Sequence, residues 1–230
     1  MRICSASIIA LFLATTAGTA EITLGNFSSG LLVGWQEEIF RNKIRTSYHL
    51  VNDAGKTVLM ARSKGAASGM LKKVDIDAKK SPLLRWSWKI MHTIKKEDAA
   101  RKSGDDFAAR IYVVFPGTFF WQTKAINYVW SARMPKGTAV KSAYTGNAFI
   151  VAVETGEDKR MTWVQEERNI YQDYLSLFGE DPPRLGAVAV MTDTDDTGDE
   201  ATAWYGDISI NQPVSPASPA VFPTEPAHLR

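Results

Sequence analysis

The chain has 230 residues, and its 27 Lys and Arg are nearly balanced by 25 Asp and Glu, which leaves a formal net charge of +2. This balance gives no electrostatic reason to expect nucleic acid or an anionic membrane surface as a partner. The single cysteine, Cys4, excludes a disulfide within the chain, so core packing alone must stabilise the fold.

Residues 1–20 have the three parts of a cleavable secretory signal peptide. Arg2 provides the basic start, residues 8–13 form an apolar run, and small residues at 17–20 form a cleavage site. The run is too short to cross a bilayer core of about 30 Å as a helix, although an uncleaved anchor is the alternative. Cleavage after Ala20 would remove Cys4 and leave 210 residues with a charge of +1, since Arg2 is the only charged residue lost. We therefore expect a periplasmic or secreted protein with no later transmembrane segment.

The remaining chain is expected to be one folded domain over residues 21–210, followed by a Pro-rich disordered tail over 211–230. Five of the ten prolines lie in this tail, where they disfavour both helix and sheet pairing. A docking motif is the alternative interpretation of the tail.

Alternation of apolar and polar residues dominates the domain and predicts many strands. In residues 83–90 the alternation places Trp86 and Trp88 on one face, so these two side chains are expected in the core, together with Trp130. The predicted strands are 83–90, 107–115, 125–132, 147–154, 186–191 and 202–210.

One helix is predicted over 170–178, because Ile170, Tyr174, Leu177 and Phe178 share a face and Gly179 follows as a terminator. A weaker helix is predicted over 95–102. Many strands and few helices predict a mainly β fold, a two-sheet antiparallel sandwich of jelly-roll type, with a closed barrel as the alternative.

The densest acidic segment is 193–200, and its first residues resemble a calcium-binding loop. Asp193, Asp195, Asp196 and Asp199 are the candidate ligands. Position twelve of the loop is Trp204 rather than a bidentate Glu, so the segment is not an EF-hand. A calcium site in a β-loop is one interpretation, and a solvated turn is the other. No other cofactor is expected.

A second polar group lies at 105–112. Period-two spacing places Asp106, Arg110 and Tyr112 on one strand face, where they would bind a polar ligand or form a satisfied ion pair. Asp105 belongs to the same group, and a carboxylate pair of Asp105 with Asp193 would suit acid–base hydrolysis.

The aromatic residues offer a third candidate. Trp121 lies in the apolar loop 117–122, and an apolar loop exposed to water usually binds something. Aromatic faces suit the apolar faces of sugar rings. By contrast, the three histidines are scattered, and no metalloprotease, nucleophile-elbow or phosphate-loop motif is present. The sequence therefore leaves open whether the protein is an enzyme.

Four motifs together resemble the bacterial DUF3047 family, a domain of unknown function. They are the run 105–115, Tyr128-Val129-Trp130, the set Trp163, Arg168-Asn169, Asp173-Tyr174 and Phe178-Gly179, and the segments 191–198 and 203–208. The resemblance covers nearly the whole chain after residue 20, and it implies an exported bacterial protein without assigned catalytic residues. The ending 205–210 also looks like the last strand of galactose-binding-like jelly rolls.

Three functional hypotheses remain at this stage. The first is an exported, periplasmic binding domain for a carbohydrate or another cell-envelope component, with Asp105, Asp106, Arg110, Tyr112 and Trp121 as candidate contacts. The second is a hydrolase or lyase of an envelope polysaccharide that uses carboxylates from Asp105, Asp106, Asp193 or Asp195. The third is an assembly factor that binds an envelope protein through the loop 119–121.

Overall fold

The computed structural model describes residues 19–213, so the predicted signal peptide with Cys4 and most of the predicted tail lie outside the described residues. The first strand begins at Thr19, two residues before the predicted cleavage point. The last ends at Pro213, three residues after the predicted end of the domain. No helix within this part of the chain has the length and apolar character needed to cross a bilayer.

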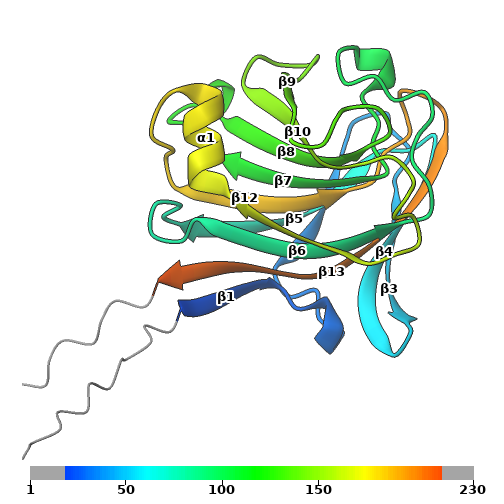
Figure 1. The fold of residues 1–230 in the computed structure, drawn as a ribbon, viewed down its shortest axis with the longest axis horizontal. Coiled ribbons are helices and arrows are strands. Elements are labelled where there is room, and N and C mark those ends of the chain that lie inside the picture. Colours follow the sequence, from blue (N-terminus) through cyan, green and yellow to red (C-terminus); the bar gives the residue numbers. More distant parts are fainter. Residues whose placement is uncertain (1–18, 214–230) are drawn as a thin grey trace, which may run out of the picture.

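Two sheets pack face to face (Figure 1). The six-stranded sheet has the order β11-β6-β13-β4-β3, with β1 also paired to β13. Its strands are β1 (Thr19–Gly25), β3 (Ser47–Asp53), β4 (Lys56–Lys64), β6 (Leu83–Ile90), β11 (Val164–Asn169) and β13 (Glu200–Pro213). The seven-stranded sheet has the order β2-β5-β12-β7-β8-β10-β9. Its strands are β2 (Trp35–Ile39), β5 (Ser68–Ile76), β7 (Ala109–Phe115), β8 (Lys124–Ser131), β9 (Ala139–Lys141), β10 (Ala148–Thr155) and β12 (Leu185–Met191).

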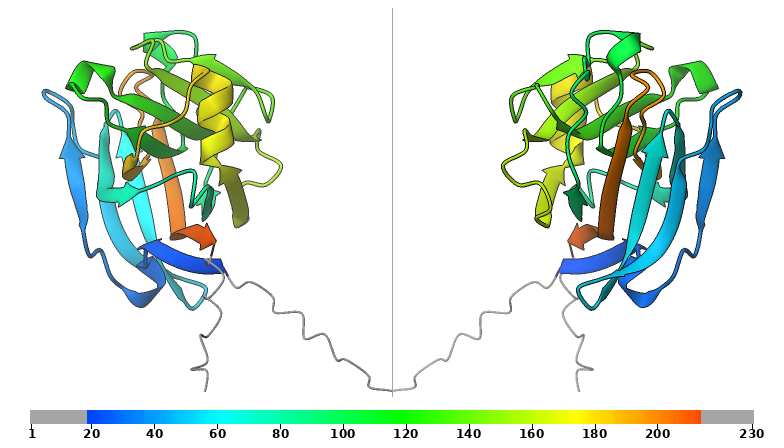
Figure 2. Two further views of the ribbon diagram at one scale, coloured as in Figure 1. Left: turned by 90° about the vertical axis from the view of Figure 1, so that its left-hand side faces the viewer. Right: turned by 90° about the vertical axis from the view of Figure 1, so that its right-hand side faces the viewer.

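The connectivity is that of a jelly roll, because β4, β5, β6 and β7 alternate between the two sheets and β12 and β13 do so again. Strand pairing is antiparallel except between β8 and β10, which run parallel and are joined by a crossover over residues 132–147. The predicted fold class, a mainly β two-sheet sandwich, is confirmed. Figure 2 shows the two layers from the sides, with the one α-helix of residues 19–213 packed beside them.

Aromatic side chains fill the space between the sheets. Trp86 of β6 stacks on Tyr128 of β8 with ring centroids 5.5 Å apart, and Trp88 meets Trp130 at 6.0 Å. All four side chains are buried, as predicted for the tryptophans. Such pairs contribute about 0.5–1.5 kcal/mol each beyond the area that they bury. The inward direction of Tyr128 and Trp130 also means that their neighbours on β8 point to the opposite, outer face of the sheet.

The predicted helix is α1 (Ile170–Phe178), which covers one end of the sandwich (Figure 1). The Asn169 side chain accepts a hydrogen bond from the Gln172 amide at 3.0 Å and so caps the first turn. Gly179 ends the helix in the left-handed region, at φ 73°. Tyr174 lies against Phe115 at the end of β7, with ring centroids 4.7 Å apart, and this contact fixes the helix on the core.

The weaker helix predicted over 95–102 is wrong. Residues 91–108 form a long loop between β6 and β7, and its only helical part is a 3₁₀ turn, η2 (Lys102–Gly104). Two further 3₁₀ turns are η1 (Phe27–Ser29) and η3 (Phe120–Gln122). Glu97 anchors this loop to the end of β8, because its buried carboxylate accepts hydrogen bonds from the Ser131 hydroxyl and from the Ala132 amide at 2.6 Å.

Substitution of Gly186 tests the close approach between β12 and the turn after β7. A Cβ at Gly186 would lie 2.6 Å from Cδ of Pro116, whose ring cannot rotate away. We expect Gly186→Ala to lower the free energy of unfolding by about 1–3 kcal/mol, as for other overpacked sites. Urea unfolding measures this. Gly146→Ala is the control, because a Cβ there meets no atom within 4 Å, and equal losses in both variants would contradict the close approach.

Titration of Glu97 gives a second prediction. Burial raises the pKa of the Glu97 carboxyl to about 7, above its value in the unfolded chain. The contribution of the protonated Glu97 side chain to the free energy of unfolding is therefore complete below the pKa of the unfolded chain, and it is lost as the pH rises towards 7. We expect wild type to lose about 3 kcal/mol between pH ~4.5 and ~7 relative to Glu97→Gln, which does not titrate. Urea unfolding across this range checks the difference, and parallel pH profiles would refute it.

Candidate functional site

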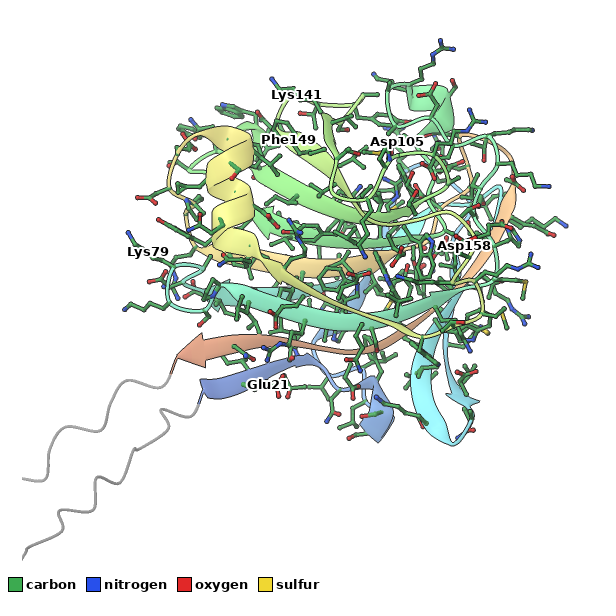
Figure 3. All side chains as sticks on the ribbon, in the orientation of Figure 1. Glu21, Lys79, Asp105, Lys141, Phe149 and Asp158 are labelled. Atoms are coloured by element: carbon green, nitrogen blue, oxygen red, sulfur yellow. The ribbon has the colours of Figure 1, made fainter. Side chains whose placement is uncertain are left out.

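A cleft of about 470 Å³ opens on the outer face of the seven-stranded sheet. It lies at the end of the sheet away from α1, near Asp105, which is labelled on the right of the molecule in Figure 3. Seven segments form this sheet cleft: the β2–β3 loop, the β4–β5 loop, the end of the β6–β7 loop, the start of β7, β8, the β9–β10 region, and the end of β12 with the loop after it. Its lining is Phe40, Lys43, Ala67, Asp105, Arg110, Tyr112, Ala125, Asn127, Ser142, Tyr144, Thr145, Ala148, Ile150, Met191, Asp193, Asp195 and Asp196.

The strand register explains the floor of the sheet cleft. Tyr112 of β7 lies opposite Asn127 of β8, which lies opposite Ile150 of β10, so these three residues form one row across the outer face. Ala125 and Ala148 form a neighbouring row. Because the two alanine side chains are short, they leave space above the sheet, and this space gives the cleft its depth.

Arg110 occupies one end of the floor and is 2 % exposed. Its Nε and Nη2 donate to the two carboxylate oxygens of Asp193, at 2.8 and 2.5 Å. Nη1 donates to Asp105 Oδ1 at 3.0 Å and to the Tyr112 hydroxyl at 3.2 Å, and Nη2 also donates to the Asp105 carbonyl. All five N–H groups of the guanidinium are thus engaged, so Arg110 has no donor left for a ligand. Its role is to fix its neighbours.

The structure brings Asp105 and Asp193 together, as the carboxylate-pair hypothesis requires, but both are held on the same guanidinium. Burial raises the pKa of the Asp193 carboxyl to about 8, and the charge of Arg110 opposes this rise. Burial also raises the pKa of Asp105, again against Arg110. Both side chains are buried and paired, an arrangement typical of a structural ion pair rather than of an acid and a base acting on a substrate.

Two groups on the floor keep hydrogen-bonding capacity. The Tyr112 hydroxyl accepts from Arg110, so its own proton is free to point into the cleft. Burial raises the pKa of Tyr112 to about 12, which keeps that proton in place at neutral pH. The Asn127 side chain is 3 % exposed, and its Oδ1 has no hydrogen-bond partner within the described chain. Buried polar atoms are nearly always paired, so this oxygen is a candidate ligand contact.

Asp106 does not join Arg110 as the period-two spacing predicts. It precedes β7, which begins only at Ala109, and its carboxylate accepts from the Thr197 amide at 2.6 Å and the Asp196 amide at 3.3 Å. Asp106 therefore positions the acidic loop. Burial raises its pKa, because these hydrogen bonds compensate only part of the lost hydration.

The acidic loop gathers a different set of residues from the four predicted. One carboxylate oxygen each from Asp106, Asp195 and Asp196 lies within 4.8 Å of the other two. Asp193 instead pairs with Arg110, and Asp199 accepts from the Glu200 amide at 2.9 Å. Asp193 and Asp199 are therefore engaged elsewhere, and of the four predicted ligands only Asp195 and Asp196 lie together. Calcium at this loop remains a prediction.

Lys43 and Tyr144 complete the rim beside the acidic loop. The ammonium of Lys43, from the β2–β3 loop, contacts the Asp195 carboxylate and lies 3.9 Å from that of Asp196. The Tyr144 hydroxyl donates to Asp196 Oδ2 at 2.5 Å. Neither residue is a candidate from its sequence context alone, because both lie in loops without a motif.

Trp121 does not line the sheet cleft. It lies in η3 beside a separate depression that includes Pro182 and Tyr174. As predicted, its loop is exposed: Phe120 is 85 % and Trp121 58 % exposed, and Phe119 stacks on Trp121 with ring centroids 4.7 Å apart. The loop is an apolar surface distinct from the cleft.

Another groove, of about 550 Å³, crosses the outer face of the six-stranded sheet. Two ion pairs line it, since Arg85 pairs with Glu167 at 2.5 Å and Lys56 lies 3.8 Å from Asp207. These pairs are solvated, which makes the groove a weaker candidate than the sheet cleft.

Comparisons with solved structures find carbohydrate-binding modules. A mutant of CBM29-2 complexed with mannohexaose is 8% identical over 84% of this chain and 92% of its own, with a TM-score of 0.43. The family 30 carbohydrate-binding module of the cellulosomal cellulase Cel9D-Cel44B of Clostridium thermocellum is 12% identical over 85% of this chain and 99% of its own, with a TM-score of 0.45. At this level of similarity they assign no ligand to this chain. No curated protein matches the sequence.

A family model described as "Protein of unknown function (DUF3047)" matches residues 33–209. This range contains every residue that lines the sheet cleft and most of both sheets. The chain therefore belongs to the DUF3047 family, as its motifs predict.

Proposed function

We propose that the protein is an exported glycan-binding domain whose ligand lies in the sheet cleft. The observation that carries this proposal is the pairing of a free acceptor with a free donor on one row of the sheet, the Asn127 Oδ1 and the Tyr112 hydroxyl proton. A sugar hydroxyl both donates and accepts, so adjacent hydroxyls of one ring are complementary to such a pair. Because Arg110 fixes Tyr112 in advance, little side-chain freedom is lost on binding.

The walls of the sheet cleft support the same ligand class. Tyr144 is 52 % exposed, and Phe40 is partly exposed at the opposite loop, so aromatic rings are available beside polar groups. Sugar rings have apolar faces that suit aromatic contact, and hydroxyl edges that need hydrogen bonds. Ser142 and Thr145 add further hydroxyls to the rim.

The signal peptide predicted over residues 1–20 supports export to the periplasm or beyond, where envelope glycans are the abundant polymers. A carboxylate-dependent hydrolase or lyase has less support, because Asp105 and Asp193 are both engaged by Arg110, and Asp195 by Lys43. Docking of an envelope protein on the loop 119–121 is a separate hypothesis that rests on the exposure of that loop.

The binding site is tested by Asn127→Ala. The loss of one hydrogen bond to a buried oxygen should weaken binding of a recognised oligosaccharide about five- to tenfold. Isothermal titration against a panel of neutral and charged hexasaccharides measures this. Asn211→Ala is the matched control, because Asn211 is also buried with an unpartnered Oδ1 but lies on the six-stranded sheet. Equal affinities for wild type and Asn127→Ala would place the ligand elsewhere.

The exposed aromatic loop is tested separately with Trp121→Ala. We expect this variant to keep the affinity of wild type for the same oligosaccharides, because Trp121 lies outside the sheet cleft. Titration of Trp121→Ala and Asn127→Ala against the same oligosaccharides distinguishes binding at the loop from binding in the sheet cleft. A loss confined to Trp121→Ala would transfer the proposal from the cleft to the loop.

Export is tested by expressing the full chain in a Gram-negative host. We expect the protein in the periplasmic fraction with Glu21 as its first residue, because residues 17–20 form the predicted cleavage site. Mass spectrometry of the intact protein and N-terminal sequencing measure this. A cytoplasmic protein that retains Cys4 would contradict export.

A further inference from the structure

We propose that the glycan bound in the sheet cleft carries free amino groups, and that one ligand ammonium takes the place of the Lys43 ammonium at the acidic rim. The inference rests on the proposed function and specifies the substrate class of the same site. It is carried by the charges around the cleft, by the position of Lys43 and by the unpaired oxygen of Asn127.

The rim has an excess of negative charge. Three carboxylates, those of Asp106, Asp195 and Asp196, lie together, and within the described chain the ammonium of Lys43 is the only cation in contact with them. The other cation of the sheet cleft, Arg110, is already matched by Asp105 and Asp193. A net negative cleft attracts cationic ligands and repels anionic ones.

Lys43 shows which chemical group fits the rim. Its primary ammonium contacts Asp195 and lies close to Asp196, and it reaches them from a loop 152 positions away in sequence. The contact is exchangeable on the lysine side, because the Lys43 side chain is 41 % exposed, whereas the Asp195 side chain that it contacts is only 10 % exposed and stays in place. A ligand ammonium can therefore replace it, while the flexible lysine moves into water.

The rim carboxylates cannot rearrange freely to suit a different ligand. Asp106 is 0 % exposed and holds the backbone of the acidic loop through the amides of Asp196 and Thr197. The Tyr144 hydroxyl donates to Asp196 Oδ2, and the other oxygen, Oδ1, lies on the side of Lys43, 3.9 Å from its ammonium. The negative charge is therefore held at the cleft opening.

Asn127 provides the second, independent indication of a ligand. Its buried Oδ1 lacks a donor and lies on the floor of the same cleft as the acidic rim. A sugar chain that places one amino group at the rim still presents hydroxyl or amino N–H donors to the floor. The floor acceptor and the acidic rim are thus both met by a ligand that is rich in donors, and the rim also disfavours a negatively charged one.

The test compares four hexasaccharides by isothermal titration in mildly acidic buffer, where sugar amines are protonated: glucosamine, N-acetylglucosamine, glucose and uronate oligomers. We expect the glucosamine hexamer to bind at least about tenfold more tightly than the glucose hexamer, and the uronate hexamer not to bind. The preference should shrink in high salt, because the rim carboxylates lie at the cleft opening, where salt screens their attraction for an approaching cation.

Rim variants locate the preference. Asp195→Asn and Asp196→Asn should each reduce the affinity for the glucosamine hexamer about three- to tenfold and leave the glucose hexamer unaffected. Lys43→Met should raise the affinity for the glucosamine hexamer, because the competing ammonium is gone. Lys64→Met is the control, since Lys64 also pairs with a carboxylate, that of Glu200 at 3.7 Å, but lies outside the cleft.

The outcomes separate this inference from the proposed function. Equal binding of the glucose and glucosamine hexamers, weakened by Asn127→Ala, would overturn the amino-sugar specificity and leave glycan binding intact. Tight binding of the uronate hexamer would also overturn it. If putrescine, a simple diamine, displaced the glucosamine hexamer at equal concentration, the site would recognise amines rather than a sugar chain. Failure of every hexasaccharide to bind wild type would overturn the proposed function itself.

Discussion

The buried Arg110 guanidinium is the interaction on which the site depends. It joins the first residues of β7 to the loop before that strand, through Asp105, and to the loop after β12, through Asp193. A buried cation without partners would cost several kcal/mol, so both loops must stay close to the sheet while the fold persists. The ring of Phe107 covers the guanidinium, with Cζ 4.4 Å from the ring centroid, and helps to exclude water.

The same guanidinium divides the polar groups of the sheet cleft into two kinds. Asp105 and Asp193 are satisfied within the protein, whereas Tyr112 and Asn127 keep a free donor and a free acceptor. Ordinarily the outer face of a sandwich sheet is polar and flat. Here short side chains at Ala125 and Ala148 lower the floor, and loops from both halves of the chain raise the walls.

The strongly alternating strands could be predicted from sequence, since residues such as Trp86, Trp88 and Ile111 mark buried positions at period two. The strands β1–β5, β9 and β11 were not predicted. Several of these are edge strands with mixed exposure, and β3 alternates only weakly, so their residues carry no clear period. The prediction of a helix over 95–102 was wrong because this charged segment has no apolar face to pack on the core. Glu97 instead holds the segment as a loop.

The candidate site was only partly predictable. Arg110 stands out because a charged residue interrupts an apolar strand, and Tyr112 and Asp105 lie within five residues of it in the sequence. Their convergence with Asp193 joins positions 83 residues apart, which no local pattern encodes. Asn127 could have been identified from the sequence, since it is the one amide in the otherwise apolar centre of its strand. Lys43 could not, because only its tertiary contact with Asp195 indicates a role.

The pairing of β1 with β13 has a consequence for how the domain is used. Thr19 lies opposite Pro213, so the first and last described residues leave the fold side by side, at the lower left of Figure 1. β13 starts next to the acidic loop and runs 14 residues, about 45 Å, before it reaches that corner. A support, a reporter or a second domain joined directly at Thr19 or Pro213 would therefore sit far from the cleft, and the domain could be immobilised for glycan arrays without obstructing it.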